Sequence, residues 1–218
     1  MNKFEAVLFD LDGTFADTSR DMCDALNIVL IEHKYEIVNC DDLKTHISRG
    51  AIGIIEYASL VNGRSIDSSL LRAEFLEEYS KNTFVHTKMI DGISDLISLI
   101  DDQNIKWGIV TNKHSKYVNK ILEGFSIREN LQCLITGDML QQAKPDPEGL
   151  LMASQILKCE LSKTVYVGDD ERDIIAGKNA GMSTVAADFG FVNKDNDITM
   201  WGADNIITEP MMLKEILI

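Results

Sequence analysis

Two aspartates at the end of an apolar run are the first residues whose spacing suggests chemistry. Asp10 and Asp12 follow the run AVLF, residues 6–9, and a single leucine separates them in DLDGT, residues 10–14. Two carboxylates this close repel each other unless a cation or a proton lies between them. The alternative is a strand that enters a turn, because Asp-Gly is a common turn pair.

Three later apolar runs also end in polar groups that suit a phosphate or a metal ion. They are TNK (111–113) after WGIV (107–110), Lys144 of KPDP (144–147) after CLI (133–135), and GDDERD (168–173) after VYV (165–167). Four such coincidences along one chain favour a ligand site over a simple turn at Asp10 and Asp12.

The aspartates of these clusters predict a magnesium site. The carboxylates of Asp10, Asp169 and Asp173 and the backbone carbonyl of Asp12 are hard oxygen ligands, which Mg²⁺ prefers. The cation would relieve the repulsion at DLDGT, because Asp10 could be ionised and metal-bound while Asp12 shares or exchanges a proton. We therefore expect Mg²⁺ as cofactor, held by Asp10, Asp12, Asp169 and Asp173.

The same residues suit phosphoryl transfer through a covalent intermediate. A carboxylate such as Asp10 can attack phosphorus and form an aspartyl phosphate. Asp12 would protonate the leaving oxygen and then activate water against that intermediate. The phosphate oxygens and their charge would be held by groups from other strand ends. These groups are Thr111, Asn112, the backbone N–H groups around Gly13, and Lys144.

Such residues meet only if the fold brings the strand ends together. Five runs are continuously apolar, as parallel strands covered by helices require: 6–9, 107–110, 133–135, 165–168 and 183–187. Segments of helical period alternate with them, with apolar faces at 22–30, 93–100 and 117–125 and a further helix from Ile174. Strand–helix alternation predicts a doubly wound, parallel α/β sheet, whose ligands bind beyond the carboxyl ends of the strands.

One region breaks the alternation. Between about Thr18 and Phe84 the patterns are helical only, over 19–34, 51–61 and 68–81. This stretch is too long for an ordinary connection within a compact domain. We therefore expect a helical domain, residues 17–85, inserted after the first strand of a core made of residues 1–16 and 86–218.

Composition limits the class of protein and its partners. The 218 residues are 45% hydrophobic and 26% charged, as in ordinary soluble globular proteins. The formal charge of −14 opposes binding to nucleic acid and to anionic membranes. No run approaches the ~18 apolar residues that span a membrane. The four cysteines (Cys23, Cys40, Cys133 and Cys159) show no CxxC or zinc spacing and are expected to be reduced and core-filling, which predicts the cytoplasm.

In order and spacing, the four motifs DLDGT, TNK, KPDP and GDDERD resemble those of the haloacid-dehalogenase superfamily of phosphatases. The resemblance covers the whole chain. It implies that Asp10 is the nucleophile, Asp12 the acid and base, Thr111 a phosphate-binding residue and Lys144 the lysine of the third motif. It further implies that Asp169 is a metal ligand with Asp173 beside it, and that the helical insert is a mobile cap.

Within that superfamily the chain is similar to the phosphoglycolate-phosphatase-type group. FVHTKMIDGI, WGIVTNK and WGAD are similar to segments of bacterial N-acetylmuramic acid 6-phosphate phosphatases. The implied substrate is a small phosphorylated metabolite with a carboxylate, either N-acetylmuramic acid 6-phosphate or phosphoglycolate. We expect the protein to be a monomer or weak homodimer. Phe15 and Thr18 replace the Leu and Ser that are frequent in this group. These replacements bear on substrate fit and leave the proposed chemistry intact.

Several polar residues keep two interpretations. Asp17 is expected to cap a helix, and Asp170 either binds metal or caps the helix after it. Lys113 contacts cap or substrate, or is solvated. Arg49, in the SRGA loop (48–51), either pairs with a substrate carboxylate or is a solvated loop residue. The four histidines have no metal spacing and are expected on the surface or in packing.

Three rival functions use similar residues. A receiver domain also combines Asp, Mg²⁺, Thr and Lys, but its first strand carries adjacent acidic residues and no large insert follows. A dehalogenase would lack Asp12. A phosphosugar mutase would use the same aspartates and differ in how the cap excludes water, so it stays open as the alternative.

Overall fold

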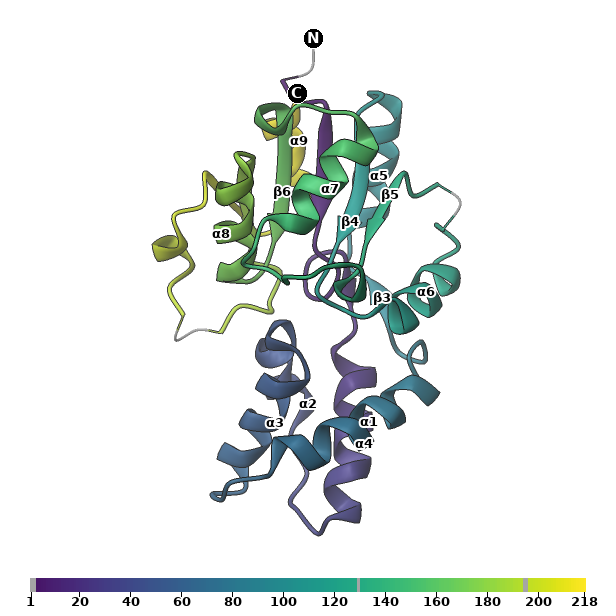
Figure 1. Ribbon diagram of the computed structural model, residues 1–218, viewed down its shortest axis with the longest axis vertical. Helices are drawn as coiled ribbons and strands as arrows, with labels where there is room; N and C mark the ends of the chain where they lie inside the picture. Colours follow the sequence, from purple (N-terminus) through teal and green to yellow (C-terminus); the bar gives the residue numbers. More distant parts are fainter. Residues whose placement is uncertain (1–2, 129, 194–195) are drawn as a thin grey trace.

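The structure is a computed structural model that describes residues 3–128, 130–193 and 196–218. The predicted core segments 1–16 and 86–218 also contain residues 1, 2, 129, 194 and 195, which lie outside the described residues. Figure 1 shows a sheet with helices on both faces and a cluster of helices at the end remote from the two termini. Within the described ranges, the helices are all too short or too polar to cross a membrane.

Six parallel strands form the main sheet, in the order β5-β4-β1-β6-β7-β8. They are β1 (Ala6–Phe9), β4 (Lys106–Val110), β5 (Cys133–Ile135), β6 (Thr164–Gly168), β7 (Ser183–Ala187) and β8 (Asn205–Ile207). The predicted α/β sheet is confirmed, and the five predicted apolar runs are β1 and β4 to β7. β8 gave no such run, because only Ile207 of its three residues is buried.

The strand order reverses at β1. This strand pairs with β4 on one side and β6 on the other, so that Ala6 lies opposite both Lys106 and Thr164. The chain runs outward from β1 through β4 to β5 and then returns to build β6, β7 and β8 on the opposite side. Beyond the carboxyl ends of β1 and β6 is therefore the position where this class of sheet binds ligands.

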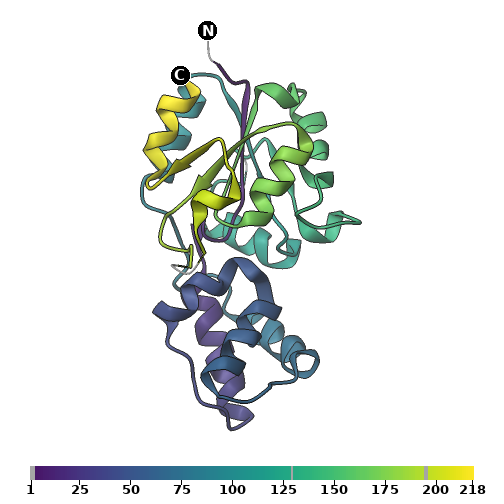
Figure 2. The same ribbon diagram turned by 90° about the vertical axis from the view of Figure 1, so that its left-hand side faces the viewer.

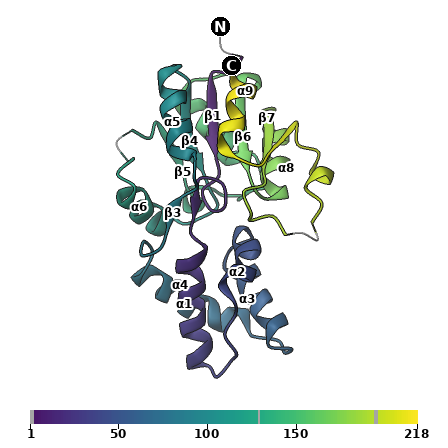
Figure 3. The same cartoon turned by 180° about the vertical axis from the view of Figure 1, so that it is seen from behind.

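Alternate residues of β1 pack against two different helix layers. Val7 and Phe9 belong to the core beneath α5 (Ile93–Asp102) and α9 (Leu213–Leu217), which lie in front of the sheet in Figure 3. Ala6 and Leu8 face the opposite layer, α7 (Glu148–Leu157) and α8 (Glu171–Ala180). Figure 2 shows both layers, one on each side of the sheet. Burial on both faces explains why β1 is apolar at every position.

The segment after β1 folds into a unit of helices with its own buried cluster. Its elements are α1 (Ser19–Glu32), α2 (Cys40–Leu43), the 3₁₀ helix η1 (Lys44–Arg49), α3 (Gly50–Val61) and α4 (Ser68–Lys81). Leu26, Leu30, Ile54 and Phe75 pack in this cluster, and Tyr117 from α6 (Ser115–Gly124) joins it from the core. We call α1 to α4 the helical unit.

Two adjacent strands carry the chain into and out of the helical unit. β2 (Ala16–Asp17) pairs antiparallel with β3 (Lys88–Met89). The segment that leaves the core therefore lies beside the segment that re-enters it. The domain boundaries predicted at 16/17 and 85/86 fall at or near this pair and stay a prediction.

The prediction that all four cysteines are reduced is wrong for two of them. Cys23 and Cys40 form a disulfide, with their Cα atoms 5.5 Å apart. Their separation of 17 residues carries no sequence signal, but α2 folds back against α1 and brings the two thiols together. Cys133 and Cys159 are free thiols, the first buried and the second partly buried.

Candidate active site

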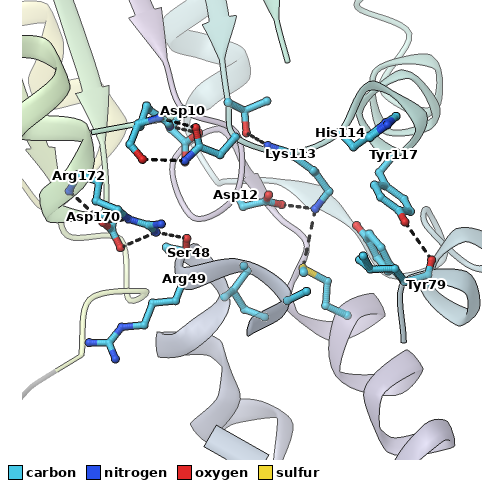
Figure 4. A pocket seen from close by; sticks show the side chains of 18 of the residues that line it. Asp10, Asp12, Ser48, Arg49, Tyr79, Lys113, His114, Tyr117, Asp170 and Arg172 are labelled. Carbon is cyan, nitrogen blue, oxygen red and sulfur yellow. Dashed lines mark hydrogen bonds and ion pairs between the residues drawn. The ribbon is translucent and has the colours of Figure 1, made fainter. Parts of the chain in front are cut away.

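The carboxyl ends of β1, β4 and β6 bring the predicted clusters together at one edge of the sheet. Asp10 follows β1 directly, and its backbone N–H donates to Val167 O of β6 at 2.9 Å. Asp10, Asp12, Thr111, Lys144 and Asp173 line one pocket, whose opposite wall belongs to the helical unit (Figure 4). Sheet topology thus places residues from all four motifs around a common space.

Lys144 is the buried cation at the centre of the site. Its Nζ donates to Asp10 Oδ1 at 2.7 Å, to Asp173 Oδ1 at 2.6 Å and to Tyr166 Oη at 2.8 Å. Burial opposes its charge, but the carboxylates of Asp10 and Asp173 outweigh that effect and raise the pKa of Lys144. Lys144 therefore stays charged in the site.

For Asp10, unlike Lys144, the effect of burial on the pKa outweighs that of the neighbouring positive charge. Desolvation raises the pKa of Asp10 to about 6, with Asp173 and Asp12 adding to the rise and Lys144 opposing it. Asp10 is 7% exposed and lines the pocket. A carboxylate poorly solvated and held beside a cation is well suited to attack an electrophile at neutral pH.

Asp169 is buried between the core and the helical unit. Its Oδ1 accepts from Thr14 Oγ1 at 3.0 Å, and its Oδ2 accepts from Ser48 Oγ of η1 at 2.5 Å. Desolvation, followed by the charges of Asp10 and Asp173, raises the pKa of Asp169 well above its usual range. Gly13, at φ +87°, is required beside it, because a Cβ there would lie 2.2 Å from Asp169 Oδ2.

Asp10, Asp169 and Asp173 form a cluster that fits a divalent cation. One carboxylate oxygen from each lies within 4.8 Å of the others, and all three residues are buried. If all three carboxylates are ionised together, as a bound cation would require, their charge exceeds that of the Lys144 ammonium by two. An oxygen-only donor set with that charge suits Mg²⁺.

Asp12 is held by two donors. Its Oδ1 accepts from Lys113 Nζ at 2.7 Å and also from Thr18 Oγ1. Lys113, left undecided by the sequence, is therefore an ion-pair partner of Asp12, and it also lies 4.9 Å from the Tyr79 ring centroid of α4. Thr18, expected to bear on substrate fit, lies at the start of α1 and contacts Asp12 through its hydroxyl. Phe15 is in the core, stacked on Trp107.

Thr111 and Asn112 line the pocket after β4, but both also hold the site together. Thr111 Oγ1 accepts from Lys113 N at 3.2 Å. The Asn112 amide donates to Lys144 O at 3.2 Å and accepts from Lys144 N at 2.9 Å, which ties the second motif to the third. Their predicted contacts to phosphate stay a prediction.

The remaining undecided residues take structural places. Asp17 Oδ1 accepts from Ser19 N at 3.1 Å at the start of α1, and Asp17 also pairs with Lys44. Asp170 caps α8, in a capping box with Asp173. The four histidines are in packing or on the surface; His46 stacks on Tyr57, and His114 caps α6 at the pocket rim.

The helical unit closes the pocket with residues that lie outside the four sequence motifs. Ile47, Ser48 and Arg49 of η1 and Arg72, Leu76 and Tyr79 of α4 line it, and the cavity measures about 240 Å³. Arg49 lies at the rim, and in Figure 4 its guanidinium points away from Asp10 and Asp12. Arg172, which Asp170 holds at 2.8 Å, donates to Ser48 O. Sequence reasoning had no signal for the contacts of Ser48 with Asp169 and with Arg172 or for that of Tyr166 with Lys144, because these partners lie 121, 124 and 22 positions apart in the chain.

Comparison with known proteins gives the family. The family model of the haloacid dehalogenase-like hydrolases matches residues 7–187, from β1 to β7, which spans every motif described above. The chain belongs to this family. Among proteins of known structure, it is similar to a "predicted phosphoglycolate phosphatase" from Haemophilus somnus. That likeness has a TM-score of 0.87 at 22% identity, covers 99% of each chain and shows the fold.

Two full-length relatives in the family carry different substrate names. The N-acetylmuramic acid 6-phosphate phosphatase of Pseudomonas putida is 33% identical over 99% of this chain and 96% of its own length. The phosphoglycolate phosphatase of Xanthomonas campestris is 34% identical over 96% of this chain and 95% of its own length. Both are named as phosphatases, and identity alone does not separate them.

Proposed function

We propose that this chain is a Mg²⁺-dependent phosphomonoesterase that works through an aspartyl phosphate on Asp10. The observation that carries the proposal is the buried arrangement of Asp10, Lys144 and Asp173 at the strand-order reversal, with Asp12 at the same pocket. It has a nucleophile, a cation beside it and a second carboxylate for proton transfer. Full-length relatives named as phosphatases support the same chemistry and do not favour the mutase alternative.

The reaction divides into two displacements at phosphorus. In the first, a carboxylate oxygen of Asp10 forms a bond to phosphorus, the bond from phosphorus to the leaving oxygen breaks, and Asp12 gives that oxygen its proton. In the second, Asp12 takes a proton from water, the water oxygen bonds to phosphorus, and the bond to Asp10 breaks. Inorganic phosphate leaves and both carboxylates regain their starting states.

The surrounding side chains position these two carboxylates. Lys144 keeps a positive charge 2.7 Å from Asp10, where charge shifts onto the phosphoryl oxygens. Lys113 and Thr18 fix the orientation of Asp12. Mg²⁺, when held by Asp10, Asp169, Asp173 and the backbone carbonyl of Asp12, would neutralise phosphoryl charge.

The helical unit is proposed to act as a cap, residues 17–85, over a core of residues 1–16 and 86–218. Ser48 contacts Asp169, and the carbonyl of the same residue accepts from Arg172, so η1 lies directly over the metal-side carboxylates. Such a cover would exclude water from the aspartyl phosphate, and it would have to lift to admit substrate.

The substrate is proposed to be a small phosphomonoester that carries a carboxylate. The names of the relatives support N-acetylmuramic acid 6-phosphate first and phosphoglycolate second, and the segments similar to the amino-sugar phosphatases set that order. The cavity of about 240 Å³ is somewhat smaller than the usual ligand pocket of about 300–1,000 Å³, which limits the closed site to one small metabolite.

The cellular setting stays a prediction. A net charge of −14 disfavours nucleic acid and anionic membranes as partners, and we expect a monomer or weak homodimer. The cytoplasmic location was expected from reduced cysteines, whereas a Cys23–Cys40 disulfide is more usual in oxidising compartments.

Metal-dependent turnover and a phosphorylated Asp10 test the proposal. Purified protein should release inorganic phosphate from p-nitrophenyl phosphate with Mg²⁺ and stop when EDTA is added. Asp10→Asn should abolish turnover, while Asp102→Asn, an exposed carboxylate on α5, should not. Mass spectrometry of acid-quenched protein should place the phosphoryl group on Asp10. Wild-type turnover by Asp10→Asn, or full activity after chelation, would contradict the proposal.

A further inference from the structure

Most cations of the pocket are already engaged. Five lysine and arginine residues line it: Arg49, Arg72, Lys113, Lys144 and Arg172. Carboxylates hold three of them: Lys113 pairs with Asp12, Lys144 with Asp10 and Asp173, and Arg172 with Asp170. Among the described residues, the guanidinium groups of Arg49 and Arg72 have no hydrogen bond or ion pair. These two are the cations free to take a charge on a substrate.

The geometry of α4 directs Arg72 towards the pocket. Arg72, Leu76 and Tyr79 are spaced i, i+4 and i+7, so they share one face of the helix, and all three line the cavity. Tyr117 Oη donates to Leu76 O at 3.0 Å, which fixes this face against α6. Arg49 differs, because its guanidinium points away from the catalytic aspartates in Figure 4.

The two ends of this face lie at different distances from the phosphate site. Tyr79 is at the catalytic end, with its ring centroid 4.9 Å from Lys113 Nζ and its buried hydroxyl without a hydrogen-bond partner among the described residues. Arg72 lies seven residues earlier, about 10 Å along the helix axis. A group bound by Arg72 is therefore well separated from the phosphoryl group, with Leu76 between them as an apolar wall.

We propose that Arg72 is a specificity-determining residue that binds a carboxylate on the leaving group, about one sugar ring away from the phosphate. A guanidinium binds a carboxylate through two parallel hydrogen bonds, which selects for that group. The proposal rests on the proposed function, and it favours the amino-sugar acid over phosphoglycolate, whose carboxylate lies too close to its phosphate.

Paired substrates test the role of Arg72. N-acetylmuramic acid 6-phosphate and N-acetylglucosamine 6-phosphate differ only in the lactyl ether that carries the carboxylate. Arg72→Ala should lower the ratio of their kcat/KM values at least tenfold, the size expected for a charged hydrogen-bonded pair. Arg72→Lys should recover part of that ratio. Arg20→Ala on α1, outside the pocket, is the matched control and should keep the wild-type ratio.

A binding measurement separates this proposal from the proposed function. In the Asp10→Asn background, calorimetry should show weaker binding of N-acetylmuramic acid 6-phosphate when Arg72→Ala is added, with a smaller change for phosphoglycolate. This readout needs no turnover, so it holds even if the wild-type protein hydrolyses nothing, a result that would overturn the proposed function alone. An unchanged ratio and unchanged binding in Arg72→Ala would overturn the proposal, as would a larger loss in Arg49→Ala or an equal loss on phosphoglycolate.

Discussion

Asp12 depends on a residue outside the four motifs. Thr18 Oγ1 donates to the same oxygen that Lys113 contacts, so removal of the hydroxyl frees Asp12 to rotate. We expect Thr18→Val to lower kcat roughly tenfold, because a hydrogen bond to a charged group contributes about 1.5–3 kcal/mol. The loss should be larger for alkyl phosphates than for p-nitrophenyl phosphate, whose leaving group needs little protonation.

Thr18→Ser is the matched variant, since it keeps the donor and removes one methyl group. It should retain near wild-type kcat on both substrates. Equal losses in Thr18→Val and Thr18→Ser would mean that packing of the methyl group, and not the hydrogen bond to Asp12, is what matters.

The buried carboxylates also make stability depend on pH. Burial and neighbouring carboxylates raise the pKa of Asp10 to about 6 and that of Asp169 well above its usual range. Because these folded-state values exceed the unfolded ones, both groups favour the folded state at low pH, and each contribution is lost as pH rises through the folded-state pKa of its group, which is about 6 for Asp10 and also well above the usual range for Asp169. We expect these groups to make the metal-free protein more stable at pH 5 than at pH 7.5.

Mg²⁺ should reverse that trend, since it binds the ionised carboxylates. Thermal unfolding with and without Mg²⁺ should show a larger increase in Tm at pH 7.5 than at pH 5. Asp169→Asn should reduce the increase at pH 7.5. The same Mg²⁺-induced shift at both pH values would argue against a metal held by Asp10 and Asp169.

At the scale of the elements, the disulfide between α1 and α2 is expected to stabilise the helical unit. The Cys23–Cys40 disulfide closes a loop of 17 residues, for which chain entropy predicts about 3 kcal/mol of stabilisation. We expect Cys23→Ser with Cys40→Ser to lower Tm by roughly 6 to 12 °C. Calorimetry would measure this shift, with Cys159→Ser as the control.

Reduction supplies the independent check on that link. Wild-type protein treated with dithiothreitol should unfold at the temperature of the double variant, and the double variant should not respond to the reagent. A double variant as stable as the wild type would mean that the two thiols contribute nothing to stability.

At the scale of the whole molecule, η1 is the part of the helical unit that contacts the core beside the pocket. Lys44 Nζ lies 4.3 Å from the Phe191 ring centroid, and Arg172 donates to Ser48 O. If the helical unit must lift for substrate to enter, Lys44→Cys and Phe191→Cys joined by a short cleavable crosslinker should lose most of their turnover.

Two controls make that experiment decisive. Each single cysteine variant, treated with the same reagent, should keep its activity, and cleavage of the crosslinker should restore the double variant. Full turnover in a sample whose crosslink is verified by mass spectrometry would contradict cap opening.

The sequence by itself determined five of the six strands of the main sheet and all four motifs. Continuous apolar runs identified β1 and β4 to β7, because strands buried on both faces need apolar residues at every position. The same rule missed β8, whose Asn205 and Ile206 are exposed. DLDGT, TNK, KPDP and GDDERD gave the family, since each motif is a short local pattern that needs no knowledge of its neighbours in space.

Only the tertiary structure decided which residues meet. Lys144 lies 134 positions from Asp10, Ser48 lies 121 from Asp169, and Cys23 is 17 from Cys40, so no local pattern could pair them. These contacts form because the strand order and the packing of the helices bring distant segments together. The β2–β3 pair, where the chain returns to the core, contributes in the same way. The guanidinium of Arg72, which has no partner in the part of the chain that the structure describes, is another feature that only the tertiary structure decided. Its place in the pocket follows from one face of α4 packed against α6, a relation that periodicity within a single helix does not contain.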